Sequence, residues 1–134
     1  MILIIIKLFL LAFAINLIYE LLHSVLYKTC IEMTVKKYVP LIFKASIVDA
    51  VWITIFYVIT FFIFKNENPL KNYYQLGLFF SISIVWAYFW EIYSTKHKRW
   101  EYSNQMPIFL KAGVTPLIQL YITGIIAFFI IFLV

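Results

Sequence analysis

Three acidic residues and one histidine stand inside apolar stretches of this chain: Glu20, His23, Asp49 and Glu91. A charged side chain in the hydrocarbon region of a membrane is costly, so such residues usually face a bundle interior or a cavity and mark functional sites. Carboxyl and imidazole groups gathered in an apolar setting are suited to proton transfer. We therefore predict that these four residues are the catalytic groups of an acid–base site.

Buried carboxylates need partners, because desolvation and mutual repulsion prevent all three from staying charged. They would share protons, bind a cation or pair with lysines from the loops. Simpler roles stay open for two of the four: Glu91 as a solvated residue at the interface, and His23 as a hydrogen-bonded structural residue. Asp49 is hardest to explain in this way, because it lies eight residues beyond Leu41, about 12 Å along a helix.

Further polar residues recur at helical spacing on the same stretches. Asn16, Glu20, His23 and Tyr27 are four, three and four positions apart, which places them on one helix face. Gln119 is predicted to contribute from the last stretch, although amide side chains such as Asn16 and Gln119 also join helices through hydrogen bonds. The third apolar stretch has a predicted polar face of its own, formed by Gly77, Ser81, Tyr88, Glu91 and Thr95. The last stretch has another, formed by Thr115, Gln119 and Thr123.

Aromatic residues accompany the acids near the third connection, residues 94–113. Tryptophan rings attract cations, so a tryptophan-lined pocket would stabilise an apolar substrate that develops positive charge. Trp100, Tyr102 and Met106 are predicted to form a lid over the bundle, the alternative being an interfacial aromatic belt. The predicted substrate-binding set is Asn16, Tyr27, Trp86, Tyr88, Trp90, Trp100, Tyr102, Asn104 and Gln119.

Membrane-spanning helices must position these residues. Only 13% of the residues are charged and 65% are hydrophobic, whereas a soluble domain carries about 25% charged residues. Backbone polar groups in lipid must be satisfied internally, which requires helices. We predict an all-α bundle, one domain over 1–134, with Pro40 stopping any helix before the second span. The predicted spans are 2–26, 41–64, 76–93 and 114–134.

The basic residues predict an orientation in the cell (inner) membrane. Of the 11 lysines and arginines, eight fall on the side where the first span ends: Lys28, Lys36, Lys37, Lys44, Lys96, Lys98, Arg99 and Lys111. Positive loops stay in the cytoplasm. The 27–40 and 94–113 loops are therefore expected in the cytoplasm and both termini outside, with the first helix retained rather than cleaved. All four helices then place polar groups near the cytoplasmic leaflet, while the outer half is nearly all Ile, Leu and Phe.

Composition also limits the cofactors and partners. With one cysteine, Cys30, the chain forms no internal disulfide and no multi-cysteine zinc site. Glu20 and His23 have the spacing of the Glu-x-x-His pairs of di-iron bundles, so a divalent metal is considered, whereas His23 and His97 are too far apart to favour haem. Membrane lipid is the expected partner. Binding to nucleic acid is not expected, because the sequence has no stripe of basic residues interleaved with aromatic ones.

The pattern Arg99-Trp100-x-Tyr102, then Met106-Pro107 and Thr115-Pro116-x-x-Gln119, resembles a signature of small uncharacterised four-helix bacterial membrane proteins. This resemblance covers about 20 residues and the four-span layout, and it implies no activity. Glu20, Ser24 and Lys28 are four positions apart, and this spacing is similar to that in the first helix of small multidrug transporters. In that family a membrane glutamate couples protons to cationic drugs. The long 94–113 connection departs from that family.

Three functions remain open from these residues. The first is a membrane enzyme of isomerase or cyclase type, which performs acid–base chemistry on an isoprenoid or lipid. The second is a proton- or cation-coupled transporter, expected as a homodimer because four helices rarely enclose a path. The third is a non-catalytic subunit of a membrane complex.

Overall fold

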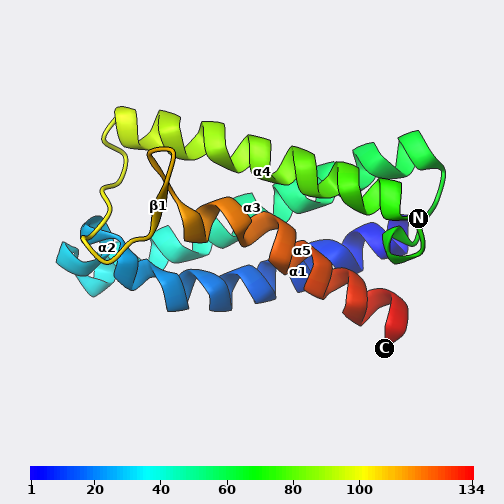
Figure 1. Ribbon diagram of the computed structural model, residues 1–134. Coiled ribbons are helices and arrows are strands. Elements are labelled where there is room, and N and C mark those ends of the chain that lie inside the picture. The colour runs from blue at the N-terminus through cyan, green and yellow to red at the C-terminus, as the bar shows by residue number, and fades with distance from the viewer.

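The computed structural model describes all residues, 1–134, and confirms an all-α bundle with four helices long and apolar enough to cross a membrane. These are the features of a multi-pass membrane protein. The long helices lie side by side, and a fifth helix is short (Figure 1). Their bounds are α1 Ile2–His23, α2 Lys28–Glu32, α3 Val35–Phe64, α4 Tyr73–Lys96 and α5 Val114–Leu133.

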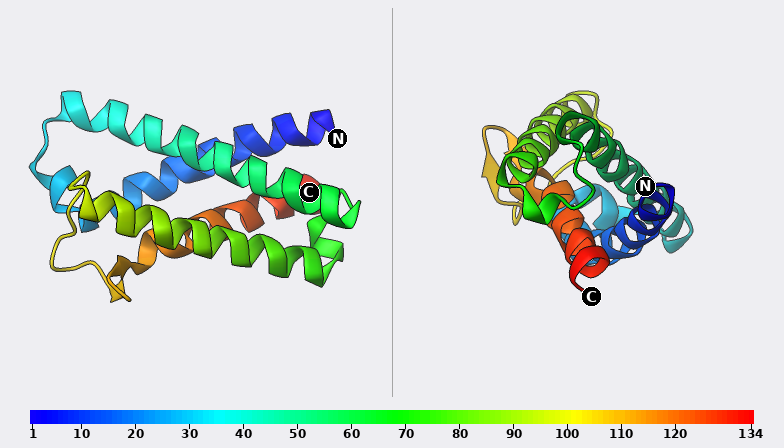
Figure 2. Two further views of the ribbon diagram at one scale, coloured as in Figure 1. Left: turned by 90° about the horizontal axis from the view of Figure 1, so that it is seen from above. Right: turned by 90° about the vertical axis from the view of Figure 1, so that its right-hand side faces the viewer.

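The bundle has two distinct ends. Both chain termini lie at one end, here called the terminus end (Figures 1 and 2). The other, the hairpin end, carries α2 and an antiparallel hairpin of β1 Ile108–Phe109 and β2 Ala112–Gly113. Single 3-10 turns, η1 Ser24–Leu26 and η2 Pro69–Lys71, follow α1 and precede α4. Helices α3 and α4 are close at the terminus end and diverge toward the hairpin end.

An apolar core joins the four long helices between these ends. Its ten buried residues are Leu8, Ala12, Ala50, Ile53, Phe56, Tyr57, Phe79, Leu120, Ala127 and Phe128. Lipid tails are as apolar as these side chains, so close packing rather than expulsion of water holds such helices together. The shape of the contacts therefore decides how the helices meet.

Gly124 illustrates this dependence, because a Cβ atom there would lie 2.7 Å from the Phe79 ring. We expect Gly124→Ala to lower the free energy of unfolding by about 1–3 kcal/mol, the usual cost of overpacking. Gly77→Ala is the matched control, since its Cβ would meet nothing within 4 Å, and it should be neutral or stabilising. Thermal unfolding in detergent measures both; equal midpoints would contradict the close α4–α5 contact.

Two helices begin earlier than predicted. Helix α3 starts at Val35 and runs through Pro40, so the prediction that Pro40 ends any helix is wrong. Pro40 lies in the second turn, where its missing N–H leaves only the carbonyl of exposed Lys36 without a partner. Helix α4 starts at Tyr73 rather than Leu76, because the Asn72 side chain caps the N–H groups of Tyr74 and Gln75.

Helix α1, by contrast, ends at His23, so Tyr27 does not extend the predicted helical face. The Ser24 hydroxyl donates to the Leu21 carbonyl at 3.1 Å and pairs with the Tyr38 hydroxyl at 2.7 Å. Such local bonds compete with helix continuation. Tyr27 is extended and bridges to Tyr102 of the third connection.

The predicted polar face of α4 is also wrong. Gly77 and Ser81 are exposed, and the Ser81 hydroxyl bonds back to the Gly77 carbonyl at 2.8 Å. The face turned into the bundle follows steps of four and three residues: Gln75, Phe79, Ser83, Ala87, Glu91 and Ser94. Packing against α5, as at Phe79 and Gly124, selects this face over the more polar one.

Polar groups are buried at the terminus end as well, which corrects the prediction of a nearly apolar outer half. Gln75 is fully buried. Its Oε1 accepts from Asn66 Nδ2 at 3.0 Å, and its Nε2 donates to the Asn66 carbonyl at 3.0 Å. The pair satisfies its own groups, as buried amides require. These bonds close the α3–α4 turn.

Candidate functional site

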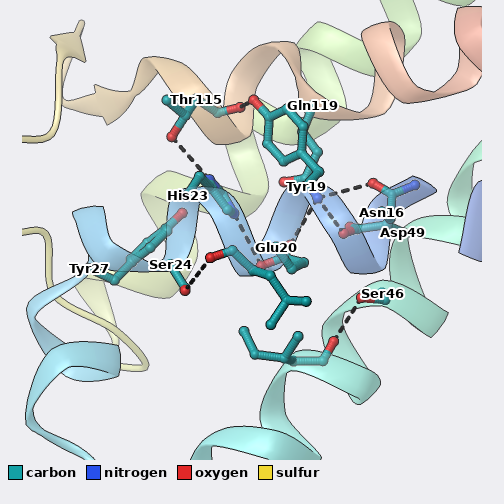
Figure 3. Close-up of polar contacts among 12 residues, drawn as sticks. Asn16, Tyr19, Glu20, His23, Ser24, Tyr27, Ser46, Asp49, Thr115 and Gln119 are labelled. Carbon is teal, nitrogen blue, oxygen red and sulfur yellow. Dashed lines mark hydrogen bonds and ion pairs between the residues drawn. The ribbon is translucent and has the colours of Figure 1, made fainter. Parts of the chain in front are cut away.

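Gln119 on α5 is the centre of a polar cluster at the hairpin end. Its Nε2 lies 2.8 Å from Glu20 Oε1, 2.8 Å from Asp49 Oδ2 and 3.0 Å from Asn16 Oδ1 (Figure 3). The carboxyl groups of Glu20 and Asp49 are also within hydrogen-bonding reach of each other. Helices α1, α3 and α5 thus bring four predicted site residues together through one amide nitrogen.

His23 lies behind Glu20 as seen from Gln119. Its Nε2 is 3.1 Å from Glu20 Oε2, and its Nδ1 is 3.1 Å from the Thr115 hydroxyl (Figure 3). The Tyr19 hydroxyl donates to the Thr115 carbonyl at 2.6 Å. The ring is therefore held from both sides, and hydrogen bonds run continuously from Thr115 through His23 and Glu20 to Gln119.

Glu91 forms a second polar centre, from α4. Its Oε2 accepts from the Tyr102 hydroxyl at 2.5 Å, from Trp100 Nε1 at 3.1 Å and, weakly, from the Tyr27 hydroxyl at 3.5 Å. Its Oε1 has no partner in the protein. Trp100 and Tyr102 belong to the connection after α4, so this carboxyl group ties that connection to the bundle.

The two tyrosines around Glu91 remain hydrogen-bond donors at neutral pH. Burial, followed by the hydrogen bond to Glu91 and its charge, raises the pKa of Tyr102 above its ordinary value. Burial, followed by the charge of Glu91, raises the pKa of Tyr27 well above the same value. The ordinary pKa of a tyrosine is already about 10, so both hydroxyl groups keep their protons.

The backbone after α4 places Trp100 and Tyr102. The helix ends with Lys98 in the left-handed region, at φ 55°, while the Arg99 N–H returns to the Ser94 carbonyl at 2.9 Å. This Schellman-type ending turns the chain back over the bundle. Farther along, the Gly113 N–H donates to the Tyr102 hydroxyl at 3.0 Å, and a Cβ at Gly113 would meet that ring at 3.1 Å.

A cavity of about 190 Å³ lies where α3 and α4 diverge, and both polar centres reach it. Glu20, Asp49 and Glu91 line it, with Gln119 and Tyr27. All four tryptophans of the protein line it too: Trp52, Trp86, Trp90 and Trp100. Trp52 and Trp86 meet across α3 and α4 with ring centroids 3.9 Å apart. The cavity thus combines three acids with an aromatic wall.

No protein-family model, curated protein or solved structure matches this chain. The resemblance of residues 99–119 to small four-helix membrane proteins therefore stays a prediction.

Not every predicted site residue lies at the cavity. Asn16 and His23 belong to the polar cluster but do not line the cavity, and Tyr102 acts through Glu91. Tyr88 donates to the Leu110 carbonyl at 3.2 Å, on the flank that carries the hairpin. Asn104 is exposed and has no hydrogen bond.

The predicted site missed several cavity residues, of which Trp52, Lys44 and Arg99 bear most on its chemistry. Trp52 follows Asp49 by three positions, a helical spacing that indicates a shared face. Lys44 and Arg99 were counted only as topological charges, yet both line the cavity. No pattern in the sequence distinguishes them from the other basic residues beside the spans.

The metal hypothesis gains no support from the geometry. Glu20 and His23 form a pair at 3.1 Å, but no group of three His, Cys, Asp or Glu side chains is placed to hold a metal ion. The imidazole nitrogens face Glu20 and Thr115 instead. The cluster is held together by hydrogen bonds.

Proposed function

We propose that this protein is a membrane enzyme of isomerase or cyclase type, which performs acid–base chemistry on an isoprenoid or lipid. The observation that carries the proposal is the cavity, where three carboxyl groups and four indole rings converge. Ligand sites are typically apolar hollows with a few convergent polar groups. An apolar substrate fits the aromatic wall, and the acids supply the reactive groups.

The polar cluster supports a role in moving protons. Gln119 Nε2 carries two hydrogens, yet three oxygens lie within 3.0 Å of it. A proton held between Glu20 and Asp49 satisfies the remaining oxygen and removes the repulsion between two buried carboxylates. His23, bonded to the far oxygen of Glu20, relays protons to and from this pair.

The proposed reaction leaves the substrate's composition unchanged. A carboxyl O–H in the cavity gives its proton to one carbon of a C=C bond, and a carboxylate removes a proton from a neighbouring carbon. Asp49 supports the first role, because only its Oδ2 is bonded to Gln119. Glu91, whose Oε1 is free, supports the second. The Trp52 and Trp86 rings, which Arg99 does not cover, stabilise the positive charge that develops between the two steps.

The charge distribution supports the proposed orientation in the inner membrane. The eight basic residues named above lie at or near the hairpin end, whereas Lys7, Lys65 and Lys71 lie toward the terminus end. The positive-inside rule places the hairpin end in the cytoplasm and both termini outside. The cavity then opens near the cytoplasmic leaflet, where a lipid enters from the side.

The alternatives draw less support from the packing. A proton- or cation-coupled transporter needs polar groups through the bundle, or a homodimer that provides them. The ten-residue apolar core separates the Gln119 cluster from the Gln75 pair. A non-catalytic subunit would not need a cavity that three carboxyl groups and four indole rings line.

Deuterium labelling tests the proposal without knowledge of the product. Protein in native-lipid particles is incubated in D₂O with an isoprenoid and lipid extract, returned to H₂O, and the lipids are weighed by mass spectrometry. We expect one lipid class to retain carbon-bound deuterium, with wild type and with Glu32→Gln, which alters an exposed acid outside the cavity. Absence of retained deuterium in every lipid would reject acid–base chemistry at carbon.

A further inference from the structure

We propose that Lys44 and Arg99 form a subsite for the phosphate head group of an anionic lipid whose chain enters the tryptophan-lined cavity. The inference rests on the proposed function and narrows its substrate class to phosphorylated isoprenoids or lipids. Both residues line the cavity, Lys44 from the third turn of α3 and Arg99 from the connection after α4. Neither has a role in the acid–base chemistry.

The two cations lack protein partners, whereas the acids have them. The ion pairs of the protein involve the N-terminus, His23 and Lys28, but not Lys44 or Arg99. Neither side chain makes a hydrogen bond within the protein. Each cavity acid, in contrast, accepts at least one hydrogen bond. The N–H donors of Lys44 and Arg99 are therefore free at the cavity, and an anionic group is the partner that both of them fit.

Arg99 is held in place without using its donors. Its guanidinium lies 4.9 Å from the Trp90 ring centre and 5.5 Å from that of Trp100. Stacking on indoles fixes the plane of a guanidinium and leaves its N–H groups free for a planar, bidentate contact. Phosphate oxygens are the natural partners of that fork. The two indoles are already occupied by Arg99, which argues against a cationic head group there.

The subsite lies closer to the membrane surface than the acids. Lys44 precedes Asp49 by five residues, about 7.5 Å along α3, and Arg99 lies beyond the end of α4 at Lys96. Both residues are exposed, at the end of the bundle that the proposed orientation places at the cytoplasmic membrane surface. A bound phosphate there would leave the lipid chain running past Trp90 and Trp86 toward Asp49.

Tryptophan fluorescence provides a direct test, because all four tryptophans line the cavity. Protein in a neutral maltoside detergent is titrated with farnesyl phosphate, farnesol, dodecyltrimethylammonium and inorganic phosphate. The variants are Lys44→Gln and Arg99→Gln, with Arg99→Lys to retain the charge. Lys37→Gln is the control, since Lys37 is an exposed cation at the same end that does not line the cavity.

We expect farnesyl phosphate to bind about ten- to a hundredfold more tightly than farnesol, the effect of charge-assisted hydrogen bonds. Lys44→Gln and Arg99→Gln should each reduce that preference, Arg99→Lys should retain part of it, and Lys37→Gln should retain it fully. Equal affinity for farnesol and farnesyl phosphate would overturn the phosphate subsite but not the proposed enzyme. Preferred binding of the ammonium compound, or of inorganic phosphate alone, would overturn it too. No response to any amphiphile would remove both proposals.

Discussion

Asp49→Asn is expected to lower the rate of carbon-bound deuterium incorporation by about 10²–10⁴-fold, the usual contribution of a general acid or base. The asparagine keeps an oxygen that accepts from Gln119, 2.8 Å from Asp49 Oδ2 in the wild type. It has no carboxyl proton to exchange with Glu20. The change should therefore remove the chemistry and leave lipid binding, read by tryptophan fluorescence, within about threefold of wild type.

Two further variants make this result specific. Glu20→Gln should lower the same rate, because it interrupts the path from His23 to Asp49. Glu32→Gln, at an exposed acid outside the cavity, should leave the rate unchanged. An Asp49→Asn protein that labels lipid at the wild-type rate would exclude Asp49 as the proton donor. Loss of lipid binding together with rate would instead assign Asp49 to substrate binding.

Glu91→Leu is expected to lower the free energy of unfolding by about 2–4 kcal/mol, because it leaves buried donors unsatisfied. Trp100 Nε1 and the Tyr102 hydroxyl donate to this carboxyl, and the Tyr27 hydroxyl lies 3.5 Å away. The connection after α4 should then detach locally. Trypsin should cleave after Lys98 or Arg99 faster than in wild type, and the thermal midpoint in detergent should fall.

Glu101→Leu is the matched control for Glu91→Leu. Glu101 is in the same connection, and its carboxylate meets Lys28 at 3.6 Å with both side chains largely exposed. Exposed pairs contribute about 0–1 kcal/mol, so proteolysis and midpoint should barely change. Similar behaviour of the two variants would show that Glu91 does not hold the connection, and that its carboxyl group matters only to the cavity.

The fold was largely predictable because membrane insertion leaves few choices. An apolar run of about 20 residues must form a helix to satisfy its backbone in lipid. Hydropathy along the sequence identifies such runs, and the structure confirms four of them. The helix ends were less predictable. Asn72 caps α4 four residues before the apolar run that starts at Leu76, and Pro40 is tolerated inside α3 because it lies near the helix start.

The site was predictable only in part. The spacing of Asn16, Glu20 and His23 indicated one face of α1, and the helix directions indicated that Asp49 and Gln119 would reach the same depth. Contacts between these residues from three helices follow that depth argument. Periodicity placed Tyr88 among the binding residues, whereas α4 turns Glu91 and Ala87 inward and leaves Tyr88 on the flank.

The sequence by itself determined the number of spans and the positions of the acids along their helices, because these depend on hydropathy and on residue number within each apolar run. Tertiary structure alone decided which face of each helix meets its neighbours. It placed three side-chain oxygens within hydrogen-bonding distance of Gln119 and directed Trp100 and Tyr102 at Glu91. It also brought Lys44 and Arg99 to one cavity. The reason is physical: rotation about a helix axis is set by side-chain packing between helices, and a one-dimensional pattern does not contain those contacts.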